Sequence, residues 1–166
     1  MGTLDSYKVV LRDMPSDTVS YQWHVNDDFF SAVEGPEIQQ GSLDVALRVK
    51  RTSATYELEF SFEGMVKVPC DRCLGLMDQP LAAQHTLRVR LGSEFEDDGE
   101  TITVPEQDGE LNVAWNLYEL IALEIPMRHV HPEGECSVSL PHSEDDTAAE
   151  TIDPRWDALR KLVNNK

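Results

Sequence analysis

Apolar and polar side chains alternate along three long runs in the middle of the chain, and this period of two constrains the fold more than any other feature. The runs cover residues 43–50, 56–68 and 81–91. Such alternation is typical of strands that pack one face against a core and expose the other to water. Because turn-like segments separate the runs, we predict an antiparallel meander of three strands, with Gly64 marking a bulge in the second.

The residues on either side of this meander predict shorter elements. Short apolar runs indicate additional strands at 7–11, 21–25 and 101–104. A short helix is expected through Phe29, Phe30 and Val33, with N-cap candidates at 26–28 and an end at Gly35-Pro36.

A second and longer helix is expected at 113–123, where apolar residues recur at helical spacing. Asn112 is its candidate N-cap and Pro126 its end. Because Trp115 and Tyr118 widen its apolar surface, we predict that it is buried against the sheet. Together these elements predict an α+β fold: an antiparallel β meander with a buried helix and, at the C-terminus, a helix on an acidic tether.

The composition changes after residue 136. Residues 137–152 are polar and acidic, which is typical of a flexible tether. Residues 153–166 begin with Asp153-Pro154, a favourable helix start, and gather bases further along. We therefore predict a single β-rich domain over residues 1–136, followed by the tether and a C-terminal helix.

The predicted C-terminal helix carries the candidate partner-binding residues Arg155, Trp156 and Leu159. A helix this short is marginally stable alone, so we expect it to dock. Two alternatives stay open for the docking site, which are a groove on a partner protein and the sheet of the chain itself.

The formal net charge is −17, and it is unevenly distributed. Between residues 43 and 91, seven bases face six acids, a net charge of about +1, which leaves about −18 for the remainder. Phosphate backbones require clustered Lys and Arg, so direct RNA binding is not expected. A basic protein partner fits this charge, although surplus acid can also serve solubility alone.

The apolar stretches predict neither export nor a membrane span. No basic and apolar leader opens the sequence. The longest apolar run, 113–127, is interrupted by polar residues and is too short to cross a bilayer. We expect a reducing, cytoplasmic compartment, where Cys-x-x-Cys indicates metal or redox chemistry.

Two cysteine knuckles are the candidate metal site. Cys70 and Cys73 form a Cys-x-x-Cys at the turn between the second and third alternating runs, and His131 and Cys136 follow the second helix. Three thiols and one imidazole supply the four soft ligands of a tetrahedral structural zinc. An empty site and a redox pair remain alternatives, and His129 competes with His131 as the imidazole ligand.

Motifs for catalysis are missing from the sequence. It contains no Gly-rich phosphate loop, no nucleophile elbow and no His-Glu-x-x-His. The acidic stretches lack the periodicity of a calcium loop. We therefore predict that the protein is not an enzyme, with a thiol- or metal-dependent enzyme using Cys70 and Cys73 as the alternative.

The order of these motifs resembles the YceD family, the large ribosomal RNA subunit accumulation proteins of bacteria, over about residues 43–162. The residues that carry the resemblance are Cys70-Asp71-Arg72-Cys73-Leu74, the helix and proline of 117–126, Val130-His131 followed by Cys136, and Asp153-Pro154-Arg155-Trp156-Asp157-Ala158-Leu159-Arg160-Lys161-Leu162. Some relatives carry further cysteines after the helix proline. This chain does not, so it has ligands for one four-ligand site.

The resemblance implies a non-enzymatic factor for the synthesis, processing or accumulation of 23S ribosomal RNA during large-subunit assembly. Combined with the acidic charge, it predicts a ribosome-biogenesis factor that binds a basic ribosomal or assembly protein, with zinc as a structural clip. A regulatory adaptor that uses its C-terminal helix is a further alternative.

Overall fold

The computed structural model describes residues 3–53 and 55–136 of the 166-residue chain. The predicted tether and C-terminal helix lie outside the described residues, as do Arg155, Trp156 and Leu159. The division of the chain at residue 136 therefore stays a prediction.

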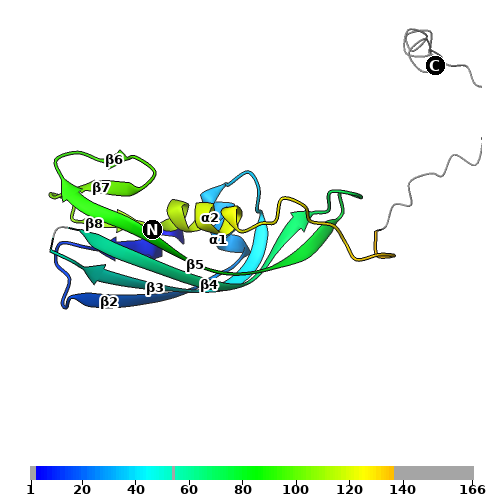
Figure 1. Cartoon of the computed structure of the whole chain (residues 1–166), viewed down its shortest axis with the longest axis horizontal. Coiled ribbons are helices and arrows are strands. Elements are labelled where there is room, and N and C mark those ends of the chain that lie inside the picture. The colour runs from blue at the N-terminus through cyan, green and yellow to red at the C-terminus, as the bar shows by residue number, and fades with distance from the viewer. Residues whose placement is uncertain (1–2, 54, 137–166) are drawn as a thin grey trace, which may run out of the picture. The chain divides into compact units, whose positions relative to one another are not determined.

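A curved six-stranded sheet forms most of the fold (Figure 1). Its strands, in spatial order, are β2 (Thr18–Val25), β3 (Gln40–Arg51), β4 (Tyr56–Pro69), β5 (Leu76–Gly92), β7 (Thr101–Pro105) and β6 (Glu96–Asp97). Neighbours pair antiparallel, except β5 and β7, which are parallel. The three predicted strands of the meander are β3, β4 and β5, and the predicted α+β class is confirmed.

The register of β3 against β4 is continuous, so the bulge predicted at Gly64 is wrong. Gly64 pairs with Leu43 in an unbroken ladder. A Cβ atom at this position would lie 2.2 Å from the carbonyl oxygen of Ser42. Glycine is required here because the two backbones approach closely, rather than because the strand gains an extra residue.

The third strand of the meander is longer than its alternation predicted. β5 begins at Leu76 instead of residue 81, because residues 76–80 pair with the last residues of β4. The additional pairing makes the β4–β5 hairpin reach beyond the helices at one end of the domain (Figure 1). This extension carries the first cysteine knuckle.

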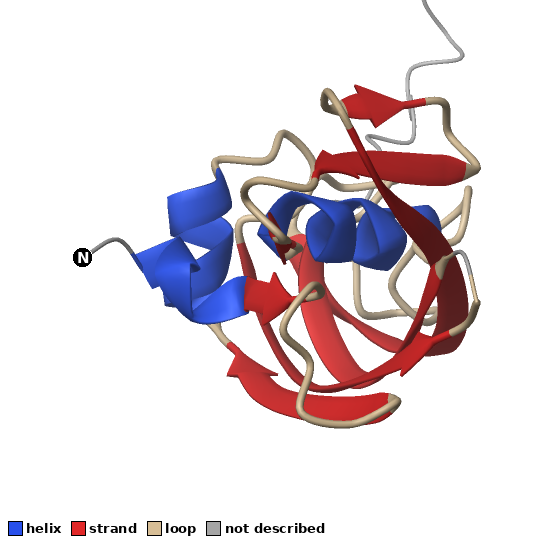
Figure 2. Cartoon of the chain, turned by 90° about the vertical axis from the view of Figure 1, so that its left-hand side faces the viewer, coloured by secondary structure: helices blue, strands red, loops and turns tan. Residues whose placement is uncertain are grey.

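The inner face of the sheet forms the core together with two helices and a small second sheet. Figure 2 shows α2 (Ala114–Leu123) inside the curve of the sheet. The remaining elements are η1 (Thr3–Tyr7), α1 (Asp27–Val33), and β1 (Lys8–Val10) paired with β8 (Glu110–Asn112). The alternating side chains that point inward are buried, among them Leu43, Val45, Leu47, Val49, Leu58, Phe60 and Phe62. Burial of each such side chain contributes roughly 1.5–3 kcal/mol.

The first helix follows its sequence prediction. Asn26 caps α1, its side-chain oxygen accepting from the backbone N–H of Asp28 at 3.1 Å. The chain leaves the helix at Glu34, which adopts a left-handed conformation. Gly35 then packs against the ring of Tyr118, where a Cβ atom would lie 2.0 Å from a ring carbon.

The second helix buries one side and exposes the other. Leu117, Tyr118 and Ile121 are buried, and the Tyr118 hydroxyl accepts from the backbone N–H of Glu37 at 2.9 Å. Trp115 and Leu123 stay exposed on the outer side. The helix is thus fixed over the sheet, and it sets the starting point of the second knuckle. No helix among the described residues is long and apolar enough to span a membrane.

Candidate metal centre

The first knuckle is the turn that closes the β4–β5 hairpin. The backbone N–H of Cys70 donates to Gly75 at 2.8 Å, and that of Leu74 donates back to Cys70 at 2.9 Å. Leu74 adopts a positive φ of 60°, which is uncommon for a non-glycine residue. This tight turn places Cys70 and Cys73 so that both thiols reach the same cluster.

The second knuckle is the segment that follows α2 and runs beside the hairpin tip (Figure 1). The backbone N–H of His131 donates to the Cys70 sulfur at 3.4 Å, so this segment is bonded to the first knuckle. A turn in which the N–H of Glu135 donates to Pro132 at 3.1 Å then returns the chain to Cys136.

Asp71 joins the two knuckles directly. Its backbone N–H donates to the carbonyl oxygen of His129 at 2.9 Å, and its carboxylate accepts from the backbone N–H of His129 at 2.8 Å. The His129 ring lies against Pro126, with Nδ1 3.0 Å from the carbonyl oxygen. His129 therefore acts as a bridge between the knuckles, and His131 is the imidazole in the cysteine cluster.

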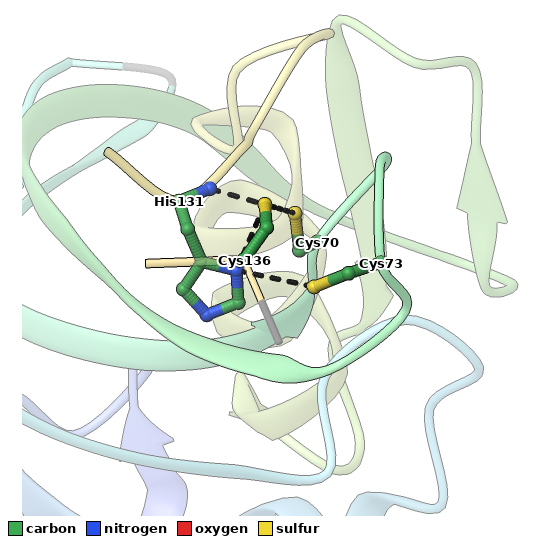
Figure 3. Close-up of side chains that lie close together, drawn as sticks. All are labelled: Cys70, Cys73, His131 and Cys136. Atoms are coloured by element: carbon green, nitrogen blue, oxygen red, sulfur yellow. Dashed lines mark hydrogen bonds between the residues drawn. The ribbon is translucent and has the colours of Figure 1, made fainter. Parts of the chain in front are cut away.

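The four predicted ligand side chains lie together at this end of the domain (Figure 3). Their sulfur and nitrogen atoms all lie within 4.8 Å of one another. The sulfurs of Cys70 and Cys136 are 3.9 Å apart, and Nδ1 of His131 lies 3.4 Å from Cys73 and 3.9 Å from Cys136. The three cysteines are not joined by disulfides.

Three of the six distances between these ligand atoms are close to the edges of a zinc tetrahedron. With Zn–S bonds of about 2.3 Å and Zn–N bonds of about 2.0–2.1 Å, ideal edges are about 3.8 Å between two sulfurs and about 3.5 Å between sulfur and nitrogen. The remaining pairs lie within 4.8 Å, so the cluster can hold a tetrahedral metal ion once its ligand atoms move inward. All four positions would be filled by protein atoms, which is the arrangement of structural rather than catalytic sites.

Hydrogen bonds favour the thiolate form of Cys70 and Cys73, the form that binds metal. Burial raises the pKa of the Cys70 thiol, but backbone N–H groups directed at its sulfur outweigh burial and lower the pKa to about 5. The backbone N–H of Gly75 lowers the pKa of Cys73. The adjacent Cys70 raises the pKa of His131, and burial raises the pKa of Cys136. In the absence of metal the cluster thus favours a thiolate beside a protonated imidazole, and an incoming cation would replace the proton.

Fold and site together define an α+β domain whose long β-hairpin carries a Cys3His cluster at its tip. The chain belongs to the YceD family, because the family model of the large ribosomal RNA subunit accumulation protein YceD matches residues 58–163. This match confirms the resemblance seen in the sequence. No curated protein and no solved structure matches the chain.

Sequence reasoning missed the role of Asp71. It lies between the two cysteines, but nothing in the local pattern shows that its partner would be His129, 58 residues further along the chain. The available signal was its position: a carboxylate inside a knuckle can accept backbone N–H groups from a segment that packs against the turn.

Proposed function

We propose that this protein is a non-enzymatic ribosome-biogenesis factor that supports the synthesis, processing or accumulation of 23S ribosomal RNA by binding a basic ribosomal or assembly protein. The observation that carries the proposal is membership of the YceD family, whose description names large ribosomal RNA subunit accumulation. We infer the mode of action from the charge of the chain, and the role of the cysteines from the geometry of their cluster.

The acidic charge favours a basic protein over RNA as the direct partner. A net charge of −17 repels a phosphate backbone and attracts the basic segments that are common in ribosomal proteins. The excess acid lies outside the meander, because residues 43–91 carry a net charge of about +1 and the remainder about −18.

Zinc is the metal we assign to the Cys3His cluster. Three thiolates and one imidazole form a soft ligand set, and three of the distances between them, at 3.4–3.9 Å, are close to the edges around a tetrahedral ion. The ion would join residues 70–74 to residues 129–136 and so hold the chain that leaves α2 against the hairpin tip. The metal would therefore act in folding and not in catalysis, because no coordination position would stay open for a substrate.

Affinity capture at low and at moderate salt tests the proposed function. The tagged full chain should enrich basic large-subunit or assembly proteins over a control bait of equal size and acidity, and depletion of the protein should lower mature 23S ribosomal RNA. Capture of no basic protein above the control, together with unchanged 23S ribosomal RNA, would refute the proposal.

A thiol enzyme is the second candidate, favoured by the lowered pKa of Cys70. The burial of this residue opposes the idea, because a nucleophile must reach its substrate. A Cys70→Ser, Cys73→Ser double variant separates the two. A structural site predicts lost stability with no turnover to lose, whereas an enzyme predicts a reaction abolished in a protein that still folds.

The partner-binding role of Arg155, Trp156 and Leu159 stays a prediction that needs its own test. If these residues contact the partner, removal of residues 153–166 should abolish capture and leave the unfolding transition of the β-rich domain unchanged. Capture that survives this deletion would assign binding to the domain instead.

A further inference from the structure

An apolar groove runs along the exposed side of α2. It has a volume of about 990 Å³, at the upper end of the range of about 300–1,000 Å³ typical of ligand sites. Its sheet side is formed by β4, β5 and β7, through Val68, Leu87 and Ile102. Its helix side is formed by α2 and the residues that follow it.

The helix side of the groove presents large apolar groups to water. Trp115 is 49% exposed and Leu123 is 73% exposed, and Met127 is fully exposed. The Trp115 ring is held in place by stacking on Tyr118, with ring centroids 5.6 Å apart and planes 26° apart. Exposed apolar side chains grouped in one groove, including a fixed aromatic ring, are typical of a binding surface rather than of scattered surface residues.

The rim of the groove is acidic. Four carboxylates line it, those of Glu37, Asp97, Glu100 and Glu119. Among the described residues that line the groove there is no Lys or Arg, and His129 is the one basic side chain. An apolar floor with a negative rim is complementary to a segment that has apolar side chains on one face and Lys or Arg beside them.

The length of the groove can accommodate a short helix. From Trp115 to Leu123 the groove follows α2 for about 12 Å at 1.5 Å per residue, roughly two turns. An amphipathic helix laid along it would place apolar residues at i, i+3, i+4 and i+7 on the floor.

We infer that this groove is the docking site for a basic amphipathic helix of a partner protein. The inference rests on the proposed function, because it names the surface through which a basic partner binds. It also predicts which feature of that partner is recognised: apolar anchors flanked by positive charge, with a salt-dependent affinity.

The test uses the full chain and a fluorescent synthetic peptide of leucine and lysine at helical spacing. A matched peptide in which glutamate replaces each lysine keeps the apolar pattern and reverses the charge. The chain should bind the basic peptide, more weakly as salt rises, and should not bind the acidic one. Equal binding of both peptides, or of neither, would overturn the inference.

Two groove variants and two matched controls locate the site. Leu123→Glu and Glu119→Lys should each weaken peptide binding by about tenfold or more. Met65→Glu and Glu63→Lys make the same kinds of change on the outer face of β4 and should leave binding unchanged. All four positions are exposed, so the unfolding transition should be retained. Equal effects of groove and control variants would overturn the inference.

The same variants, used as baits in affinity capture, separate this inference from the proposed function. If the wild-type chain and both groove variants capture the same basic proteins, the groove is not the site and the proposed function stands. If the wild-type chain captures no basic protein while the peptide binds in the groove, the proposed function is refuted. The groove would then still be a binding site for a basic amphipathic helix.

Two other occupants of the groove would overturn the inference. Occupation by a second copy predicts a dimer that Leu123→Glu converts to a monomer without peptide present. Occupation by the chain's own C-terminal residues predicts that Leu123→Glu shifts the NMR signals of residues 137–166 in the peptide-free protein.

Discussion

The core of the sheet and the tip of the β4–β5 hairpin are held together in different ways. In the core, strands and helices bury a large set of apolar side chains, and each contributes a part of the stability. At the tip, Leu74 and Leu76 are exposed, and the structure depends on four ligands and the Asp71–His129 contacts. The core thus spreads its stability over many residues, whereas the tip concentrates it in a few.

Because they are stabilised differently, the core and the hairpin tip should respond differently to mutation. A distributed core tolerates surface change and fails only when a large buried group is removed. A tip held by a few interactions can open without unfolding the sheet, because its residues lie at the far end of a long hairpin.

The largest effect is expected from Phe60→Ala in the core. Phe60 is fully buried on β4, and its truncation should destabilise the protein by about 3–5 kcal/mol. Denaturant unfolding measures this loss. Ser61→Ala, one residue away on the outer face, should change stability by no more than about 0.5 kcal/mol. A loss below about 1 kcal/mol for Phe60→Ala would contradict the description of the core.

Cys73→Ser should remove the metal and open the tip alone. Hydrogen exchange should become fast at residues 70–75 and 129–136, while the amides of β3 and β4 remain protected. Arg72→Ser, in the same turn but without a ligand atom in the cluster, is the matched control and should keep its metal. Retained metal in Cys73→Ser, or loss of protection throughout the sheet, would show that tip and core are not separate.

Asp71→Ala should loosen the tip without removing a ligand. The loss of the carboxylate that accepts from the His129 backbone removes about 1.5 kcal/mol. Metal affinity, measured by competition with a chelating dye, should fall by about tenfold. Asp78→Ala removes an exposed carboxylate from β5 outside the knuckles and should leave the affinity unchanged. A variant that binds metal as tightly as the wild type would show that the Asp71–His129 contacts do not order the site.

The smallest effect concerns the pH response of the metal-free protein. The pKa of Cys70 is lowered to about 5, below that of an unfolded thiol. This group therefore stabilises the fold fully above the unfolded pKa, and the contribution is lost as pH falls through about 5. The ultraviolet absorbance of the thiolate should persist down to that pH, and Cys70→Ser should lose the part of this absorbance that disappears as pH falls through about 5. Protonation near the ordinary thiol pKa would contradict the hydrogen-bond arrangement around this sulfur.

The central strands could be predicted from the sequence because the alternation of apolar and polar side chains shows which face of each strand is buried. The pairing of β3 with β4 follows from two adjacent runs and a short turn. The parallel pairing of β7 with β5 could not be predicted, because five residues carry no information about which edge they join. Gly64 misled the prediction, since a glycine in a strand indicates either a bulge or a close backbone approach and only coordinates distinguish them.

The candidate site, too, could be predicted from the sequence only in part. Each cysteine knuckle is a local pattern, so both could be recognised in the sequence. Their convergence depends on the length of the β4–β5 hairpin and on the placement of α2, which are properties of the tertiary structure. The choice of His131 over His129 depends on the contact between Asp71 and His129, which no local spacing encodes.

Metal analysis of freshly purified protein, prepared without chelator or metal-affinity resin, tests the central claim most directly. We predict one zinc per chain, with an X-ray absorption spectrum of three sulfurs at about 2.3 Å and one nitrogen at about 2.0–2.1 Å. Protein that is folded, fully reduced and free of zinc, or zinc bound without the sulfur of Cys136, would contradict the claim that the two knuckles are joined by one metal.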